Sequence, residues 1–355
     1  MTDITRHSYK LVEFGKPVQP VDEAVAAPAG SEVVVRIAAC GVCHSDLHLA
    51  DGYFDLGGGQ RLDMSRATPL PHVLGHEIVG TVIAVGPDAP EGLIGQRRLV
   101  YPWIGCGACA VCESGEEHLC MRPRSLGINV DGGFATHVTL PDARYLVDID
   151  GLDEKLACTY ACSGLTAFSA LKKIGRRAEG ESVLIIGAGG VGLAAVHLAA
   201  KVLGVRPFVA DLDPAKREAA LKSGAIEAID PNEPDLRRRL LKQTGGFAGV
   251  IDFVGAESTA EMGVAVLRKG GHFVSVGLFG GALKLPLPTL AMRGISITGS
   301  YVGSPAELRE LVALLREQGP YPLPVTPRPL DEAQQALDDL RAGHVVGRIV
   351  LTPSG

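Results

Sequence analysis

Four cysteines near the end of the first third of the chain limit its fold more than any other feature. Cys106, Cys109 and Cys112 stand at every third position on a Gly-rich turn, and Cys120 follows. This spacing lets four thiolates converge tetrahedrally on one Zn²⁺ at roughly 2.3 Å. Disulfides between such near neighbours would close only small, strained loops. A four-thiolate site has no open coordination position, so we predict a structural zinc and expect any chemistry elsewhere.

Length and composition narrow the class of protein. The chain has 355 residues, of which 46% are hydrophobic and 21% charged, which predicts a soluble globular protein of two domains. Its N-terminal stretch shows no signal-peptide pattern and no run approaches a membrane span, so we expect a cytoplasmic protein. Eight cysteines, mostly at ligand spacings, suit a reducing compartment. The formal charge of −6 argues against nucleic acid as a partner.

The chain changes character near Ser163. Before it, short alternating β patterns, such as those of 32–37 and 78–85, lie among Gly and Pro and predict an irregular β domain. After it, apolar strands alternate with helical stretches, as in a doubly wound parallel sheet. We expect six such strands, at 182–186, 207–210, 225–229, 249–253, 272–276 and 296–299.

The last fifty residues follow a third pattern. A helix is expected over 305–318, then a Pro-rich extended stretch, a helix over 330–341 and a strand over 347–351. We expect this tail to rejoin the first domain. The predicted fold is therefore α/β, with a β-rich domain of residues 1–162 and 302–355 and a nucleotide-binding domain of residues 163–301.

A Gly-rich turn follows the first of the six strands and opens an apolar helix. In this GxGxxG context Gly187 permits the tight turn, Gly189 lets the backbone approach a pyrophosphate, and Gly192 lets the helix pack on the strand. The helix N-terminus adds N–H groups and a favourable dipole. The remaining residues of the turn that we assign to cofactor binding are Gly190 and Val191.

Asp211 stands 19 residues after Gly192, at the end of the next strand. A carboxylate there can accept both hydroxyls of the adenosine ribose and would repel a 2′-phosphate, which favours NAD over NADP. Asp211 could instead cap the following helix, although Asp213 fills that role better. Lys216 is either near the same ribose or a surface lysine.

A second metal motif is spread over three segments. Cys43 lies in a Cys-His-Ser-Asp run, His76 lies in Gly-His-Glu, and Cys162 precedes a helix containing Thr166. Two thiolates and one imidazole leave one zinc position for water or substrate, as a catalytic zinc requires.

At this point the chain resembles the zinc-dependent medium-chain alcohol dehydrogenases, and among them the tetrameric microbial type. The likeness covers nearly the whole length, from the Cys43 motif through the four-cysteine knuckle and the Gly-rich turn to the terminal Val-Gly-Arg. It implies a GroES-like catalytic domain beside a Rossmann domain, two zinc ions per chain, NAD and a homotetramer. It also implies hydride transfer between an alcohol and NAD.

The resemblance assigns catalytic roles by position. Cys43, His76 and Cys162 would bind the catalytic zinc, with Glu77 near enough to replace water. Ser45 would hydrogen-bond the substrate oxygen, and His48 would pass the proton to solvent. Asp46 would orient the ligand imidazole, and capping of the following helix is a compatible second role.

Cofactor contacts are also implied by the resemblance. His44 stands where the family often places an Arg against the pyrophosphate. Arg348 would be a second pyrophosphate contact or an exposed strand charge. Thr166 would lie beneath the nicotinamide. Val276 and Leu278 would border its carboxamide, although core packing explains them nearly as well.

Cys40 and Cys158 offer an alternative. With Cys43 and Cys162 they could make a second closed four-thiolate site, which would turn the protein into a binding module. We reject this because residue 40 belongs to or ends a strand and because His76 would lack a role. We expect both thiols to be buried small side chains.

The substrate is the least constrained feature. A loop over 55–62 is longer than is typical of microbial members and should border the pocket, with Phe54 and Trp103 as pocket walls or core residues. We expect a medium or bulky apolar alcohol, cyclic or aromatic. The alternatives are a polyol or aldehyde-oxidising relative and, from another class, a non-catalytic zinc- and NAD-binding regulator.

Overall fold

A six-stranded parallel sheet forms the nucleotide-binding part in the computed structural model, which describes residues 4–353. Its strand order is β13-β12-β11-β14-β15-β16, so the order reverses between β11 and β14, where doubly wound sheets bind ligands. Each expected strand is present, but β13 is shorter than predicted, and β14 and β15 begin earlier. The strands are β11 (Val183–Ile186), β12 (Phe208–Ala210), β13 (Glu227–Ile229), β14 (Phe247–Asp252), β15 (Leu267–Ser275) and β16 (Ser296–Gly299).

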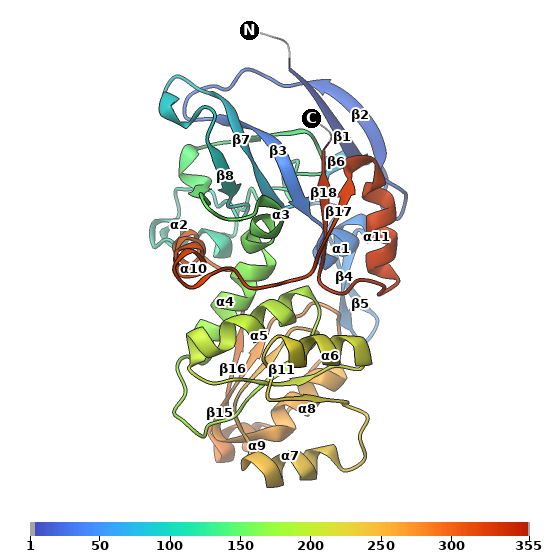
Figure 1. The fold of residues 1–355 in the computed structure, drawn as a ribbon. Coiled ribbons are helices and arrows are strands. Elements are labelled where there is room, and N and C mark those ends of the chain that lie inside the picture. The colour runs from blue at the N-terminus through green and yellow to red at the C-terminus, as the bar shows by residue number, and fades with distance from the viewer. Residues whose placement is uncertain (1–3, 354–355) are drawn as a thin grey trace.

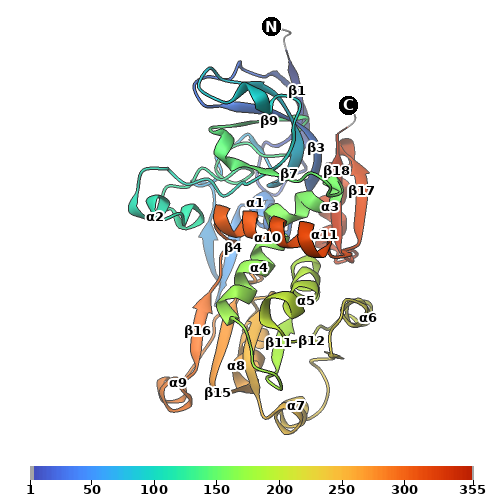
Figure 2. The ribbon, with the colours of Figure 1, turned by 60° about the vertical axis from the view of Figure 1, so that its left-hand side comes forward.

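Helices cover this sheet (Figures 1 and 2), and its central strands β11 and β14 are buried. All four residues of β11 are buried, as expected for a continuous apolar run in a parallel sheet. Helix α4 packs on α5, and α7 packs on α8. The helices are α4 (Ser163–Ile174), α5 (Gly190–Leu203), α6 (Pro214–Lys222), α7 (Leu236–Thr244), α8 (Glu257–Val266) and α9 (Leu287–Arg293).

The β-rich part holds a mixed sheet of order β10-β8-β7-β3-β18-β17, with β9 also paired to β3. A smaller sheet has the order β2-β1-β6. These strands are β1 (Thr5–Leu11), β2 (Gln19–Ala24), β3 (Val33–Gly41), β6 (His72–Val73), β7 (Glu77–Val85), β8 (Arg97–Val100), β9 (His137–Leu140), β10 (Leu146–Asp148), β17 (Val325–Pro329) and β18 (Arg348–Thr352). The chain therefore has the expected α/β fold class.

The C-terminal tail lies against the β-rich part. Strand β18 pairs antiparallel with β3, with Leu351 opposite Cys40 and Val350 opposite Gly41. This pairing brings Arg348 close to the end of β3, where the Cys43 motif begins. Helices in this part are α1 (His44–Asp51), α2 (Ala110–Glu113), α3 (Glu154–Ala157), α10 (Pro305–Gln318) and α11 (Ala333–Arg341), with short 3₁₀ turns at Glu91–Leu93, Glu117–Leu119, Ala143–Tyr145, Cys158–Ala161 and Leu330–Glu332.

The segment expected as a long open loop is instead a β-hairpin. Strand β4 (Tyr53–Gly57) pairs antiparallel with β5 (Gln60–Asp63), with Phe54 opposite Leu62. Three successive glycines, Gly57, Gly58 and Gly59, have φ of +79°, +60° and +78° and so form the turn. Side chains other than glycine rarely adopt this backbone region, and the Gly-rich composition that suggested a free loop therefore supplies a tight turn.

Among residues 4–353, the structure contains no helix with the length and apolar character needed to span a membrane.

Candidate metal and cofactor site

Three cysteine and histidine donors from distant segments meet at the end of β3. Cys43 immediately precedes α1, His76 immediately precedes β7, and Cys162 immediately precedes α4. Their donor atoms all lie within 4.8 Å of one another, and the two sulfurs are 3.9 Å apart. Pairing of Gly41 with Glu77 between β3 and β7 explains why the first two segments are adjacent.

The chemistry of these donors fits a zinc ion. His76 is fully buried, yet neither of its ring nitrogens has a hydrogen-bond partner, although buried polar groups almost always have one. The contact with the Cys162 sulfur, together with His76, holds the pKa of the Cys43 thiol well below its usual range despite burial. Two cysteine sulfurs, together with a buried imidazole whose Nε2 has no hydrogen-bond partner, are a ligand set that suits Zn²⁺.

No fourth sulfur completes this group in the part of the chain that the structure describes. Cys40 lies within β3, with its sulfur 3.7 Å from the Gly41 carbonyl oxygen. The Cys158 sulfur lies 3.2 Å from the Lys155 carbonyl oxygen. Both thiols are fully buried, and burial raises their pKa, so both stay neutral. The closed four-thiolate alternative therefore has no support in the geometry.

Asp46 holds the two ligand segments together. It is fully buried, and its carboxylate accepts hydrogen bonds from the backbone N–H of Cys43 at 2.8 Å and of Gly75 at 3.2 Å. The same carboxylate lies 3.4 Å from Nδ1 of His76, which leaves Nε2 for a metal. Asp46 also occupies the third position of α1 in a capping arrangement, so both expected roles are geometrically compatible.

We expect Asp46→Asn to weaken zinc binding by about 10- to 100-fold, because the imidazole loses the charge that orients it and raises its basicity. Competition with a chromogenic chelator measures this affinity. Asp51→Asn is the matched control, since Asp51 is at the other end of α1 and pairs with Arg341. Equal zinc affinity in both variants would show that Asp46 only caps the helix.

A buried ion pair joins the metal donors to the Gly-rich turn. Glu77 is fully buried, and its Oε1 lies 2.5 Å from Nη2 of Arg348 and accepts a hydrogen bond from the Ser163 N–H at 3.1 Å. Cδ of Arg348 lies only 2.5 Å from where a Cβ on Gly190 would sit. Glu77 was expected at the metal and Arg348 at the cofactor, but nothing in the sequence indicated their direct contact. Neither Glu77 oxygen belongs to the three-donor group.

Two expected proton carriers lie along α1. Oγ of Ser45 is 3.8 Å from the Cys43 sulfur. His48 is partly buried one turn later, and its ring centroid lies 4.8 Å from that of Phe54 on β4. Burial lowers the pKa of His48, while Asp51 and Cys43 oppose the shift. A neutral imidazole at this position is able to accept a proton near neutral pH.

An aromatic wall stands beside the donors. Trp103 is 2% exposed, its Nε1 donates to the Ala161 carbonyl oxygen at 2.9 Å, and its ring centroid lies 5.1 Å from that of His76. The ring of Tyr301 packs edge-on against Trp103 at 5.8 Å. Tyr301 is 45% exposed, but desolvation of its hydroxyl raises the pKa to about 12, so the hydroxyl stays protonated. Sequence reasoning missed Tyr301, because an isolated tyrosine after a strand carries no signal.

The Gly-rich turn has the geometry of a phosphate-binding loop. Gly187 has a φ of +90°, and a Cβ on Gly192 would overlap the Gly187 carbonyl oxygen. Around Gly189, which precedes α5, no atom lies within 4 Å of a would-be Cβ, so space is open for a ligand. Val191 lies in the first turn of α5, where the helix N–H groups are free to bind an anion.

Asp211 is fixed beside this turn. Its carboxylate accepts hydrogen bonds from the backbone N–H of Ala188 at 2.7 Å and of Asp213 at 2.9 Å. Asp213 caps α6 through the Ala215 N–H, so the capping role belongs to it. Arg217 donates to the Asp211 carbonyl oxygen at 2.8 Å, which places a guanidinium close to Asp211. Lys216 lies in the same helix and is partly buried.

The remaining expected cofactor contacts lie at the start of α1, in the first turn of α4 and after β15. His44 is exposed as the first residue of α1. Thr166, in the first turn of α4, is 8% exposed and donates its N–H to the Cys162 carbonyl oxygen at 2.8 Å. Val276 directly follows β15 and is partly buried, whereas Leu278 is 46% exposed. That exposure means that plain core packing does not account for Leu278.

The four clustered cysteines form a second donor group. The sulfurs of Cys109 and Cys112 are 3.5 Å apart, and those of Cys109 and Cys120 are 3.8 Å apart. The sulfur of Cys106 lies 4.0 Å from that of Cys112, which completes a compact set of four sulfurs. The arrangement fits one tetrahedral zinc.

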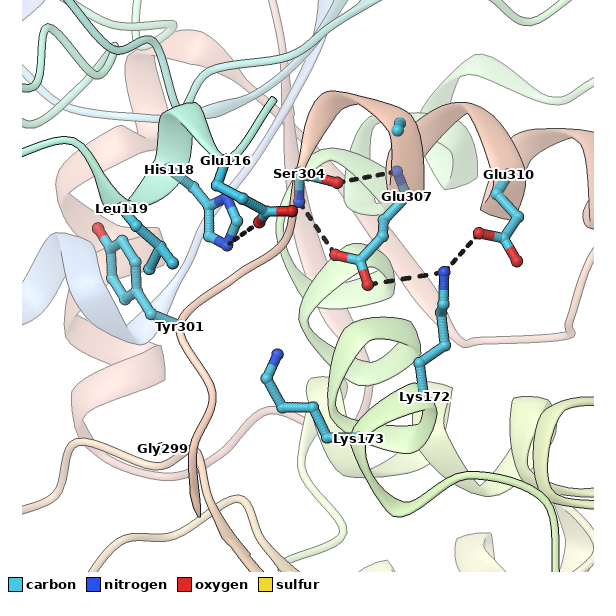
Figure 3. A pocket seen from close by; sticks show the side chains of 11 residues that line it. Glu116, His118, Leu119, Lys172, Lys173, Gly299, Tyr301, Ser304, Glu307 and Glu310 are labelled. Carbon is cyan, nitrogen blue, oxygen red and sulfur yellow. Dashed lines mark hydrogen bonds and ion pairs between the residues drawn. The ribbon is translucent and has the colours of Figure 1, made fainter. Parts of the chain in front are cut away.

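A separate cavity of about 470 Å³ is lined in part by Tyr301 (Figure 3). None of the seven metal donors lines it. Its charges are largely satisfied internally, because Lys172 pairs with Glu307 and Glu310, while His118 lies 3.6 Å from Glu116. It is therefore distinct from the metal site.

Comparisons with known proteins cover nearly the whole chain. Models of an alcohol dehydrogenase GroES-like domain and of a zinc-binding dehydrogenase match residues 29–151 and 190–317. The NAD-dependent alcohol dehydrogenase of Sulfurisphaera tokodaii is 36% identical over 97% of this chain and 99% of its own length. The crystal structure of an alcohol dehydrogenase from Aeropyrum pernix is 32% identical, covers 98% of this chain and 100% of its own, and has a TM-score of 0.87. An acetophenone reductase from Geotrichum candidum, solved with NAD, is 27% identical, covers 98% and 97%, and has a TM-score of 0.85.

Proposed function

Since the chain belongs to the zinc-dependent medium-chain alcohol dehydrogenases, we propose that Cys43, His76 and Cys162 hold the catalytic zinc of this NAD-dependent enzyme. Its class of reaction is alcohol oxidoreduction with zinc and NAD as cofactors. One observation supports this assignment of residues most strongly. Glu77, next to His76, pairs with Arg348, and Arg348 lies against Gly190. These contacts join the three metal donors to the nucleotide turn. A closed structural zinc at the other four cysteines completes the proposal.

When bound, zinc supplies Lewis-acid polarisation of a substrate oxygen, and NAD supplies a hydride acceptor. The residues of this chain transfer the substrate's proton and orient the metal ligand. Ser45 is placed to accept a hydrogen bond from the substrate hydroxyl, and as it takes that proton it releases its own towards His48, one turn later on α1, whose imidazole accepts it and passes it to solvent. Asp46 keeps His76 oriented. Trp103 closes one wall against water.

Cofactor preference is proposed to depend on Asp211. We expect Asp211→Gly to raise the ratio of kcat/KM for NADP over NAD about tenfold or more, because a repelling carboxylate leaves while Arg217 remains nearby. Asp213→Gly is the control, since it removes a carboxylate that only caps α6. Initial rates with both cofactors give the ratios. An unchanged ratio in Asp211→Gly would place the ribose elsewhere.

The proposed substrates are medium or bulky apolar alcohols, cyclic or aromatic, and the corresponding ketones or aldehydes. Trp103, Tyr301 and Phe54 line the region around the donors and the relay histidine with aromatic carbon. The structural similarity to an acetophenone reductase agrees with this class.

A substrate panel with purified enzyme and NAD tests this assignment through the absorbance of NADH. It should contain small primary alcohols, cyclohexanol, 1-phenylethanol, benzyl alcohol, a polyol series and aldehydes. We expect the highest kcat/KM for the cyclic and aromatic alcohols. A preference for polyols or for ethanol would refute the substrate class without affecting the metal assignment.

The proposed assembly is a homotetramer. One edge of the six-stranded sheet is β16, a strand whose Ile297 is 40% exposed, and Leu287 and Met292 on neighbouring α9 are 78% and 73% exposed. An unpaired strand edge beside exposed apolar side chains favours pairing with a second copy. Light scattering after size-exclusion chromatography should give four times the mass of the chain. A monomer mass would refute the proposal.

A further inference from the structure

We propose that Gly57, Gly280 and Gly281 are positioning residues that close the mouth of the cofactor cleft by direct contact between two backbones. Gly57 ends strand β4 of the hairpin, and the other two glycines lie in the loop that follows β15. Figures 1 and 2 show the β4–β5 hairpin reaching from the β-rich part to the nucleotide-binding part. The inference rests on the proposed function, since it concerns the release of NAD and NADH.

The contact is too close for any side chain. A Cβ on Gly57 would lie 2.7 Å from the carbonyl carbon of Gly281 and 2.8 Å from its Cα. A Cβ on Gly280 would lie 2.8 Å from Cβ of Asp55. Real side-chain carbons do not approach backbone this closely, so the two parts of the chain meet here only because glycine stands on both sides.

Both sides of the contact are held firmly. Oδ1 of Asp55 accepts a hydrogen bond from the Gly57 N–H at 2.7 Å, which fixes the hairpin turn. On the other side, the N–H groups of Phe279 and Gly280 donate to carbonyl oxygens of the loop after β14, at 3.1 Å and 3.0 Å. A Cβ on Gly281 would lie 2.7 Å from the backbone nitrogen at the start of α8. The contact is therefore between two ordered loops.

This contact joins the loop that we assign to the nicotinamide side to the hairpin that packs on His48. The loop carrying Gly280 follows Val276 and Leu278, which we assign to the nicotinamide side. The hairpin carries Phe54, which packs on the ring of His48. Opening the Gly57–Gly281 contact therefore frees the hairpin beside the cofactor. It also loosens Phe54, which packs on the relay histidine His48.

The hairpin has little else to hold it in place. All four residues of β5 are exposed, and no atom lies within 4 Å of a would-be Cβ on Gly58 or Gly59. Loss of the contact should therefore cost little core packing. We expect it to change the rate at which cofactor leaves rather than the stability of the fold.

The test compares Gly57→Ala with Gly58→Ala. Both residues have left-handed φ, at +79° and +60°, so both variants strain the backbone, but only the first adds a carbon against Gly281. The rate of NADH dissociation is measured by stopped-flow energy transfer from the single tryptophan, Trp103, after displacement with excess NAD. We expect release about tenfold faster from Gly57→Ala, and within about twofold of wild type from Gly58→Ala.

A second pair keeps the test informative if Gly57→Ala does not fold. Asp55→Ala removes the hydrogen bond that fixes the turn, whereas Asp63→Ala removes an equivalent bond, to the Ser65 N–H at 2.8 Å, at the foot of the same hairpin. Only Asp55→Ala should accelerate NADH release. Wild-type release rates in Gly57→Ala and Asp55→Ala, or equal acceleration in the controls, would overturn the inference. Failure of the wild type to bind NADH would instead refute the proposed function.

Discussion

Alanine in place of Cys43 is expected to lower kcat for alcohol oxidation by about a thousandfold or more while leaving NADH affinity largely unchanged. The substitution removes one of three donors from a site that has no spare sulfur within reach among residues 4–353. Loss of the Lewis acid forfeits several kcal/mol of barrier lowering, and each 1.36 kcal/mol is a factor of ten in rate. The nucleotide turn at Gly187 to Gly192 makes no use of this sulfur, so the cofactor should still bind. Steady-state rates and fluorescence titration with NADH measure the two effects.

Cys40→Ala is the matched control for this experiment. Cys40 is equally buried and only three residues away, but it belongs to β3 and lies outside the donor group. Its replacement should retain most of the activity and both metal ions. Full activity in Cys43→Ala, or equal losses in the two variants, would mean that the reaction does not depend on this metal site.

The closed site should behave in the opposite way. Replacement of Cys109 by alanine is expected to reduce the zinc content from two ions to one per chain and to lower Tm by about 10 °C. A structural zinc contributes directly to folding, because its ligands are brought together only in the folded chain. Calorimetry and elemental analysis of the purified variant measure both quantities.

The initial activity per folded Cys109→Ala molecule should stay near that of the wild type. The two cysteine variants therefore separate chemistry from stability, since each site should affect one property and spare the other. Unchanged Tm in Cys109→Ala, or complete loss of turnover at a temperature where it stays folded, would show that the four-cysteine site is not purely structural.

Sites formed by residues close together in the chain, such as the four-cysteine cluster and the Gly-rich turn, were predictable from the sequence. The spacing of the four clustered cysteines predicts that their sulfurs converge, and the structure brings the four sulfurs together. The strand before Gly187 and the carboxylate after the next strand likewise define a nucleotide turn. Their prediction depended on residues close together in the chain, where geometry follows from a few bonds.

Features created by tertiary contact were not predictable in the same way. The hairpin at 53–63 was expected to be a loop, because three successive glycines indicate a flexible backbone when the pairing of the flanking strands is not known. The buried pair of Glu77 and Arg348 joins residues 271 positions apart, and nothing in either motif signals it. The contact between Tyr301, which follows β16, and Trp103 joins residues that are far apart in the chain. Such contacts depend on how distant elements pack, which no local pattern encodes.

The most direct test of the central claim is a crystal structure of the zinc-loaded enzyme with anomalous data collected on both sides of the zinc absorption edge. Two zinc peaks per chain are expected. One should lie between Cys43, His76 and Cys162 with a position open towards the Gly187 turn, and the other should lie among the four clustered cysteines. A single peak, or a first peak closed by the sulfur of Cys40 or Cys158, would contradict it.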